Sequence, residues 1–393
     1  MSDATIMKRA LRLARRGEGF VEPNPMVGCL VVRDQTIIGQ GYHRRFGAPH
    51  AEVEALEDCR ARGQDPAGAD VFVTLEPCCH EGKTPPCTAA LVAAGVGCVH
   101  VAMEDPFDLV SGRGIEALRR AGHHVRIGVC ESEARLMNAP YLKRTANGLP
   151  WVITKWAQSV DGRIAAADGE SRWISNERSR RGVHRLRARV DAILVGIGTV
   201  LADDPKLTAR GVRLRRRARR VVLDPQLRLP LTAQLLQGAD LRVTVATRQN
   251  PDRAKAARLA ERGVEIIELP PADREGSLLA MRPLLNHLAQ RHGATNVLAE
   301  GGGKIFGALF ADELVDQVLV YVAPRIMADT RAVAAVDGLA SHGVAGAPSL
   351  KLLGVKRIDG DVLLDYRVVR AEQGQGQGKR RSDPPRRAGS ATK

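Results

Sequence analysis

The sequence predicts two consecutive α/β domains. Its 393 residues exceed the length of a typical single domain. Apolar residues make up 44% of the chain, which is enough for sizeable cores, and strand-like and helix-like stretches alternate along both halves. Such alternation is typical of layered folds in which helices cover a sheet. Because aromatic residues amount to only 3%, aliphatic side chains must fill the cores.

The first half reads as a layered α/β domain with helices on both faces of its sheet. Hydrophobic periodicity predicts helices at residues 6–14 and 51–62, and another starting near Cys87. Short apolar or alternating runs predict strands at residues 27–32, 37–42, 71–75, 98–103 and 125–129.

The second half begins after a predicted junction at residues 141–150. Strands are predicted at residues 151–157, 192–195, 221–223, 242–246, 264–268, 296–299 and 318–322. Helices are predicted at residues 177–189, 251–262, 278–291 and 304–309. We therefore expect domains at residues 1–147 and 148–370, followed by a disordered basic tail at 371–393 that is rich in Gln and Gly.

A pattern typical of metal sites lies in the first half. His50-Ala51-Glu52 is followed by Pro77-Cys78 and then by Cys87. An imidazole and two thiolates leave the fourth position of a tetrahedral zinc ion open to water, as in catalytic sites. Glu52 would then move protons without binding the metal, in the H-x-E and P-C pattern of zinc deaminases. Eight residues separate the two cysteines instead of two, and the neighbouring Cys79 and His80 are alternative ligands.

The net charge of +15 raises the question of nucleic-acid binding. Residues 209–220 contain seven arginines and no acidic residue, and the tail is also basic. Neither segment has interleaved aromatic residues to stack on bases, so we interpret them as a solvated loop and a flexible tail. Phosphate attraction by the loop stays open.

We expect a soluble, cytoplasmic protein. No stretch approaches the ~20 consecutive apolar residues of a membrane span, and the arginine-rich start is not followed by an apolar signal region. Seven cysteines, with three of them close to a histidine, favour metal chemistry over a disulfide framework.

In the metal motif and in the segments around it, the chain resembles the bifunctional deaminase/reductase family of riboflavin biosynthesis. The matching pieces are Pro23-Asn24-Pro25-Met26-Val27-Gly28, Gly41-Tyr42-His43, His50-Ala51-Glu52-Val53-Glu54-Ala55-Leu56, Thr74-Leu75-Glu76-Pro77-Cys78 and Thr84-Pro85-Pro86-Cys87. The resemblance implies a cytidine-deaminase-like α/β/α fold, Zn²⁺ on His50, Cys78 and Cys87, and Glu52 as the catalytic proton shuttle. It also implies that Asn24 binds the pyrimidine, although a turn-forming Asn between prolines is an alternative explanation.

The chain departs from the family pattern in two segments. Cys79 stands where such proteins commonly have Ser. Asp105-Pro106-Phe107-Asp108-Leu109-Val110-Ser111-Gly112 follows a D-P-N-P-x-V-x-G type of segment with Phe107 and Asp108 at its centre. If this segment touches substrate, its contacts must differ, while the metal chemistry should be kept.

The second half carries further motifs of the same family. They include Thr154-Lys155-Trp156-Ala157, Trp173-Ile174-Ser175, Gly196-Ile197-Gly198-Thr199 and Leu298-Ala299-Glu300-Gly301-Gly302-Gly303-Lys304. Glycines between a strand and a helix let backbone N–H groups approach a phosphate. The spacing is not G-x-G-x-x-G, so a Rossmann dinucleotide site is not supported.

The resemblance covers roughly residues 5–368 and implies a reductase domain of dihydrofolate-reductase-like fold that uses NADPH. Its implied cofactor contacts are Ala157, Trp173, Thr199, Asp203, Gly302, Gly303, Lys304, Ile305, Phe306, Gly307 and Ala308. Its implied substrate contacts are Ser171, Arg187, Leu207, Arg210 and Glu300. Arg187 and Arg210 suit a ribose phosphate, because guanidinium groups bind phosphate with two parallel hydrogen bonds. Lys155 is a candidate for positioning the reacting groups, and the arginines after Arg210 are candidates for the 2′-phosphate of NADPH.

The expected enzyme is both a hydrolase acting on a cyclic amidine and an NADP-dependent oxidoreductase. It would deaminate a phosphoribosylaminopyrimidine and then reduce the ribosyl group to ribityl. The expected partner is this small molecule, with no nucleic acid and no membrane, and we expect a homo-oligomer, either a dimer or a tetramer. The alternatives are a nucleic-acid deaminase, which would place basic and aromatic residues around the zinc, and a protein in which only one domain is active.

Overall fold

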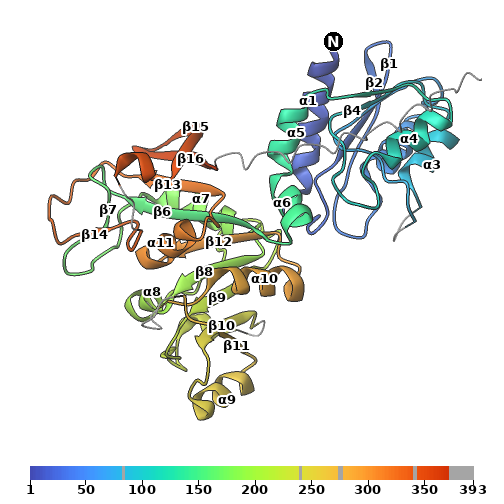
Figure 1. The fold of residues 1–393 in the computed structure, drawn as a ribbon. Helices are drawn as coiled ribbons and strands as arrows, with labels where there is room; N and C mark the ends of the chain where they lie inside the picture. Colours follow the sequence, from blue (N-terminus) through green and yellow to red (C-terminus); the bar gives the residue numbers. More distant parts are fainter. Residues whose placement is uncertain (82–84, 239–240, 273–277, 340–342, 371–393) are drawn as a thin grey trace, which may run out of the picture.

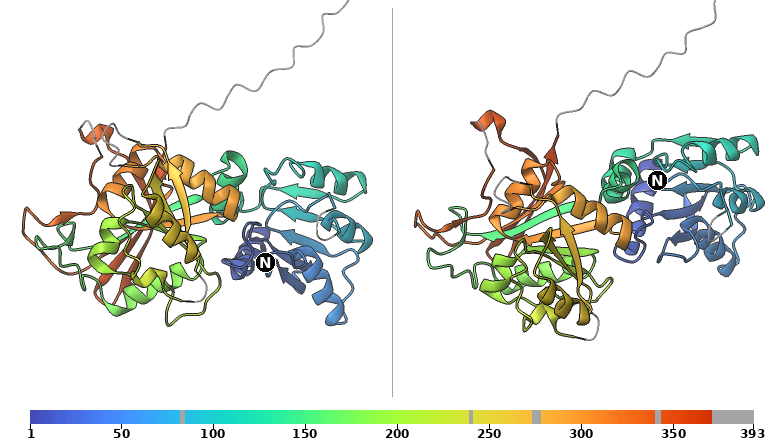
Figure 2. Two further views of the ribbon diagram at one scale, coloured as in Figure 1. Left: turned by 90° about the horizontal axis from the view of Figure 1, so that it is seen from below. Right: turned by 60° about the horizontal axis from the view of Figure 1, so that its bottom comes forward.

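The structure is a computed structural model that describes residues 1–81, 85–238, 241–272, 278–339 and 343–370. Its two lobes are each built on a separate main sheet, and the chain passes between them once at the end of α6 (Figure 1). Two further views show the lobes side by side (Figure 2). Hydrogen bonds from Arg215 to Glu18 and from Arg216 to Glu22 join them. The predicted tail at 371–393 lies outside the described residues.

The first lobe contains a five-stranded sheet in the order β2-β1-β3-β4-β5. β1 is antiparallel to both β2 and β3, whereas β3, β4 and β5 run parallel. The strands are β1 (Gly28–Arg33), β2 (Thr36–Tyr42), β3 (Asp70–Val73), β4 (Val99–Val101) and β5 (Val125–Ile127).

Helices cover both faces of this sheet, as predicted. They are α1 (Asp3–Ala14), α2 (Ala51–Ala61), α3 (Cys87–Ala93), α4 (Arg113–Arg120), α5 (Glu131–Met137) and α6 (Ala139–Asn147). The buried side chains of α1 and α5 pack with Leu30 and Phe72 on one face, and those of α2, α3 and α4 pack with Val31 and Val71 on the other. Neighbouring strand residues thus feed two separate cores, because successive side chains point to opposite faces.

The second lobe contains a nine-stranded mixed sheet in the order β11-β10-β9-β8-β12-β6-β13-β16-β15. Neighbouring strands run parallel from β11 to β13, and β16 and β15 then add an antiparallel hairpin at one edge. Its strands are β6 (Trp151–Gln158), β8 (Ala192–Gly196), β9 (Arg219–Leu223), β10 (Val243–Arg248), β11 (Glu265–Leu269), β12 (Asn296–Gly301), β13 (Gln317–Val322), β15 (Ser349–Ile358) and β16 (Asp361–Val369). β7 (Arg163–Ala165) and β14 (Val333–Ala334) form a separate small pair.

The helices of the second lobe also lie in two layers. They are α7 (Glu177–Arg187), α8 (Ile197–Asp203), α9 (Arg253–Glu261), α10 (Met281–His292) and α11 (Gly303–Ala311). α10 and α11 share one core with Val152 and Leu194, and α7, α8 and α9 share the other with Ile153 and Ile193. Among the described residues, no helix combines the length and the apolar character needed to cross a membrane.

One sequence prediction needs refinement and another needs correction. The predicted junction at 141–150 contains the passage between the lobes, but most of it is the helix α6, which ends where Gly148 adopts a left-handed conformation with φ +67°. The arginine-rich segment at 209–220 is not a solvated loop, because Arg215 and Arg216 contact the first lobe and Arg219 begins β9. Composition alone could not reveal that acceptors from a distant part of the chain lie opposite these arginines.

Candidate active sites

Two helix starts and one loop bring the predicted zinc ligands together. His50 is the N-cap of α2, Cys87 is the first residue of α3, and Cys78 lies on the loop after β3. His50 Nδ1 lies 3.2 Å from Cys87 Sγ and 3.5 Å from Cys78 Sγ. Tetrahedral zinc holds nitrogen and sulfur ligands roughly 3.5 Å apart. This donor set and its spacing therefore fit a zinc ion.

The two neighbouring candidate ligands face elsewhere. Cys79 Sγ lies 3.7 Å from the carbonyl oxygen of Leu109. His80 lines the adjoining cavity, and its buried Nδ1 has no hydrogen-bond partner within the described part of the chain. The cluster of atoms suited to a metal contains His50, Cys78 and Cys87 but neither of these residues.

The cluster favours negative charge on the sulfur of Cys78. A hydrogen bond from Cys87, helped by His50, lowers the pKa of Cys78 to about 4. The same contact raises the pKa of Cys87, and the hydrogen bond to Cys78 raises that of His50. A cysteine thiolate is the form that binds a metal, so the site is prepared for a cation.

Glu52 lies in the first turn of α2 and lines the same cavity while remaining only 3% exposed. Burial raises the pKa of its carboxyl to about 7, and the nearby Cys78 thiolate adds to this effect. A carboxyl with a pKa close to neutrality can both accept and donate a proton during turnover.

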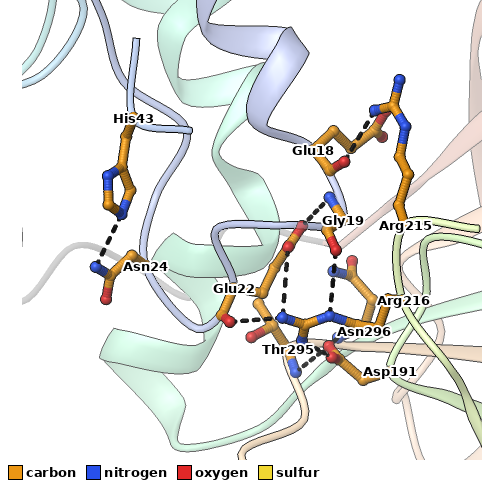
Figure 3. Close-up of polar contacts among 10 residues, drawn as sticks. All are labelled: Glu18, Gly19, Glu22, Asn24, His43, Asp191, Arg215, Arg216, Thr295 and Asn296. Atoms are coloured by element: carbon orange, nitrogen blue, oxygen red, sulfur yellow. Dashed lines mark hydrogen bonds and ion pairs between the residues drawn. The ribbon is translucent and has the colours of Figure 1, made fainter. Parts of the chain in front are cut away.

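A cavity of about 690 Å³ opens beside these residues and includes Asn24 in its wall. Asn24 Nδ2 lies 3.2 Å from His43 Nε2 (Figure 3). His43 Nδ1 lies 3.1 Å from the carbonyl oxygen of Pro49. Because a carbonyl only accepts, His43 Nδ1 carries the proton and Nε2 accepts from the Asn24 amide. Burial lowers the pKa of His43, which is consistent with a neutral ring. Asn24 Oδ1 is therefore the acceptor that the amide can offer to a ligand.

The side chain of Glu76 holds the segment of residues 105–115 through hydrogen bonds to its backbone. Its buried carboxylate accepts hydrogen bonds from the backbone N–H groups of Asp105, Gly112, Gly114 and Ile115, at 2.8–3.1 Å. The Cβ of any residue replacing Gly114 would lie 2.0 Å from the Pro77 carbonyl oxygen, which explains the glycine. Sequence reasoning missed this role, although a carboxylate directly before Pro77-Cys78 was a visible signal.

The remaining cavity wall includes the two unusual residues of the 105–112 segment. Phe107 is 40% exposed, and Asp108 is also exposed. Asp105 accepts a hydrogen bond of 2.8 Å from Tyr141 Oη, and both residues line the cavity. The second lobe contributes Ala289 and Gln290, from α10. The sequence offered no signal that the second lobe would complete this wall.

The glycine-rich turn of the second lobe borders another cavity, of about 910 Å³. The predicted cofactor residues that line it are Thr199, Gly302, Gly303, Lys304, Ile305 and Ala308. Gly302 is the N-cap of α11 and has φ +100°, a conformation that glycine adopts readily because it has no Cβ. Phe306 and Gly307 are instead buried within α11. The backbone N–H groups at the start of α11 border the cavity, and such groups fit a phosphate-bearing cofactor.

Besides Phe306 and Gly307, three further predicted cofactor residues lie outside this cavity lining. Ala157 is in β6, Asp203 is the last residue of α8, and Trp173 is 61% exposed with Arg180 over its ring at 4.4 Å. The cavity contains Arg163 and Arg228, which sequence reasoning did not select. The arginine cluster at residues 213–220 does not line it, so the prediction that this cluster holds the 2′-phosphate of NADPH is not supported.

Arg187 and Glu300 form a buried ion pair. Arg187 Nε and Nη2 donate to the two oxygens of Glu300 at 2.6 and 2.7 Å. The two-pronged guanidinium that was predicted to bind phosphate is thus engaged by a carboxylate. Burial opposes ionisation of Glu300, but Arg187 and Lys155 outweigh it and lower the pKa of the carboxyl. Burial also opposes the charged form of Lys155, and for an amine this lowers the pKa.

Of the other predicted substrate residues, Arg210 is linked to this pair through Thr208. Thr208 accepts through its carbonyl oxygen from Arg187 Nη1 at 3.3 Å and through its hydroxyl from Arg210 Nη1 at 3.0 Å. Arg210 is exposed, Leu207 is buried and Ser171 is half-buried. Arg210 is therefore better placed than Arg187 to meet a phosphate arriving from solvent.

Comparison with known families gives a match for each lobe. Residues 1–103 match the family model described as the cytidine and deoxycytidylate deaminase zinc-binding region, and residues 150–364 match the RibD C-terminal domain. The riboflavin biosynthesis protein RibD of Escherichia coli is 40% identical over 371 residues, covering 93% of this chain and 99% of that protein. The protein of the same name from Aquifex aeolicus is 40% identical over 328 residues, covering 83% and 88%.

Two solved structures share the fold of both lobes. RibD of Acinetobacter baumannii (form 1) has a TM-score of 0.81 at 38% identity, covering 94% of this chain and 99% of that one. A diaminohydroxyphosphoribosylaminopyrimidine deaminase/5-amino-6-(5-phosphoribosylamino)uracil reductase from Thermotoga maritima has a TM-score of 0.81 at 34% identity, covering 93% and 99%.

Proposed function

The chain belongs to the RibD family of riboflavin biosynthesis, and we propose that it acts on the substrates named for its Thermotoga maritima relative. As a RibD protein it is a bifunctional enzyme, with a zinc-binding deaminase domain and a reductase domain that uses NADPH. The first lobe would convert diaminohydroxyphosphoribosylaminopyrimidine to the aminouracil by hydrolysis. The second would then reduce the ribosyl group of this product to ribityl. The observation that carries the proposal is the metal-type cluster of His50, Cys78 and Cys87, since His50 and Cys78 line the same cavity as the buried Glu52.

For deamination we assign His50, Cys78 and Cys87 as zinc ligands and Glu52 as the catalytic acid and base. A zinc ion bound there would lower the pKa of a coordinated water to about 7. Glu52 takes a proton from the attacking water and delivers it to the departing amine, which leaves as ammonia. Asn24 accepts a hydrogen bond from the pyrimidine through Oδ1, because its amide N–H faces His43.

For reduction we assign the cavity at the start of α11 to NADPH, which supplies hydride when bound. Thr199 and the 302–308 turn would contact the cofactor, together with Ala157, Trp173 and Asp203, and Arg228 would meet its 2′-phosphate. Ser171, Leu207, Arg210 and Glu300 would contact substrate, with Arg210 at the phosphate. Arg187 holds Glu300 in place, and Lys155 lies near enough to influence its charge.

Product analysis tests both half-reactions. The purified protein is incubated with the diaminopyrimidine phosphoriboside, with and without NADPH, and the products are identified by mass spectrometry. Without NADPH, we expect one nitrogen to be replaced by oxygen and ammonia to appear. With NADPH, the product should gain two further hydrogens. Failure to form either product from the pure compound would contradict the assigned substrate.

Metal removal should separate the two activities. Dialysis against a strong zinc chelator is expected to abolish ammonia release, because the coordinated water is then lost as a nucleophile. Oxidation of NADPH with the deaminated intermediate should continue, since the reductase site does not include the metal cluster. Zinc added back should restore deamination. Full deamination by protein shown to be metal-free would refute the zinc assignment.

We further propose cytoplasmic domains at residues 1–147 and 148–370, assembled as a homo-oligomer, either a dimer or a tetramer. The proposed cytoplasmic location is supported by the seven cysteines, all of which are free thiols. Association is supported by β15, which lies at one edge of the large sheet. Its exposed large apolar residues are Leu350, Leu352, Leu353 and Val355. An unprotected apolar edge strand is a ready surface for a second copy.

A charge on this strand should break the association. Leu352→Asp is expected to convert the oligomer to a smaller species, because the carboxylate would lose its hydration at the interface. Light scattering coupled to size-exclusion chromatography measures the mass. Val92→Asp, at an exposed position on α3, is the control and should keep the wild-type mass. An unchanged mass for Leu352→Asp would place the interface elsewhere.

A further inference from the structure

The loop that carries Asn24 rests on the second lobe. It leads from the short helical turn Arg15–Gly17 toward β1, and Figure 3 shows residues Glu18, Gly19 and Glu22 facing Arg215 and Arg216. Arg215 Nη1 donates to the Glu18 carbonyl oxygen at 2.9 Å. The arginine-rich segment therefore has a specific partner in the deaminase lobe.

Arg216 makes the central contacts of this junction. Its Nη2 donates to the Glu22 carbonyl oxygen at 2.7 Å, and its Nε lies 3.4 Å from the Gly19 carbonyl oxygen (Figure 3). The Gly19 N–H in turn donates to Glu22 Oε1 at 2.9 Å, which closes the turn between these two residues. One guanidinium thus binds both ends of a closed backbone turn.

Arg216 is itself fixed from the opposite side. Its Nη1 is paired with Asp191, which is largely buried. Asp191 Oδ2 also accepts from the backbone N–H groups of Thr295 and Asn296, at 2.8 and 2.9 Å. Asn296 begins β12, a central strand of the large sheet that also carries Glu300. The guanidinium is therefore anchored to the rigid core of the reductase lobe.

The turn held by Arg216 positions two residues of the deaminase cavity. Asn24 N–H donates to the Val21 carbonyl oxygen, and Phe46 N–H donates to that of Phe20, both at 3.0 Å. Asn24 and Phe46 both line the cavity of about 690 Å³. A shift of the turn would thus move a wall of the deaminase site while leaving the zinc ligands on their own helices and loop.

We propose that Arg216, although it belongs to the reductase lobe, is a positioning residue for deamination that holds the Gly19–Glu22 turn and thereby Asn24. This inference rests on the proposed function of the first cavity. It gives the reductase lobe a direct part in the first reaction, which a free deaminase domain would lack.

The test compares the two half-reactions in Arg216→Met, using the full chain. We expect the KM for the diaminopyrimidine in deamination to rise about tenfold with a much smaller change in kcat, because binding contacts are displaced while Glu52 and the metal stay in place. Zinc content should be unchanged. Reduction, assayed separately with the deaminated intermediate and NADPH, should stay within about twofold of wild type. Arg216→Lys, which keeps the charge, should recover part of the lost affinity.

Arg258→Met is the matched control, because Arg258 is an exposed arginine of the reductase lobe on α9. Its kinetics should equal those of wild type. An unchanged KM in well-folded Arg216→Met would overturn the proposal, and so would an equal loss of both half-reactions, which indicates a general structural role. Absence of deamination in wild type would instead refute the proposed function.

Gly19→Ala provides a second route to the same result, and it decides the matter if Arg216→Met does not fold. An added Cβ would lie 3.0 Å from Arg189 Cβ and 3.1 Å from Arg215 Cβ, at a residue with φ +80°. It would push the turn off the reductase lobe without altering Arg216. The same rise in KM for deamination, with reduction preserved, is expected, and a wild-type KM would contradict the proposal.

Discussion

Glu52→Gln is expected to lower the rate of deamination by about 10³-fold, which lies within the range for loss of a general acid and base. The glutamine side chain keeps the shape of the buried glutamate but cannot accept the proton of the attacking water. Because Glu52 is not among the metal-binding atoms, zinc should remain bound at the wild-type ratio. Ammonia release measures the reaction, and metal analysis of the same sample measures zinc.

Glu57→Gln is the matched control, because it makes the same change at an exposed position of the same helix. It should release ammonia at the wild-type rate. Reduction of the deaminated intermediate should be normal in both variants. If Glu52→Gln keeps its zinc and also its deaminase rate, another group carries the proton and the assignment of Glu52 is wrong.

The first site could be predicted from sequence because its chemistry is concentrated in short motifs. His50 and Glu52 are two residues apart, and Pro77-Cys78 marks the second ligand. The choice of Cys78 over Cys79 followed from that motif, and the structure brings Cys78 to His50 while Cys79 faces Leu109. The supporting contacts were harder to predict, since Glu76 accepts from N–H groups up to 39 residues away.

The fold was predictable where hydrophobic periodicity is strong. The predicted strands of the first lobe, and its predicted helices at α1, α2 and α3, lie within a few residues of the observed ranges. The helices α4, α5 and α6 of the same lobe were not predicted. The hairpin β15–β16 was missed, because its exposed apolar residues do not show the alternation of a half-buried strand. β7, β14 and the short helix α8 were missed because so few residues carry little periodic signal.

Long-range charge pairing was the least predictable feature. Arg187 is predicted to bind phosphate, and nothing in the sequence indicated that two of its guanidinium nitrogens also donate to Glu300, 113 residues later. Arg215 and Arg216 were expected to be solvated, but they bind backbone carbonyls of the other lobe. A sequence shows that an arginine is present, whereas its partner depends on which distant segments the fold brings beside it.

Glu300→Gln should impair both the stability and the activity of the reductase lobe. The variant leaves the buried Arg187 and Lys155 without a compensating carboxylate, and breaking a buried ion pair in this way costs about 3 kcal/mol. We expect a lower Tm for the reductase lobe and a fall of at least about tenfold in kcat/KM for reduction, while ammonia release is kept. Calorimetry and NADPH oxidation by the folded protein measure the two effects.

A second substitution separates the structural role of Glu300 from its role in the reaction. Arg187→Met combined with Glu300→Gln removes one of the uncompensated charges, so the double variant should be more stable than Glu300→Gln alone. Its reductase activity should stay low, because the carboxylate that faces the substrate is still absent. Glu261→Gln, an exposed change on α9, should behave as wild type in both measurements. If the double variant recovers reduction together with stability, Glu300 serves only to balance Arg187, and the proposed substrate contact is wrong.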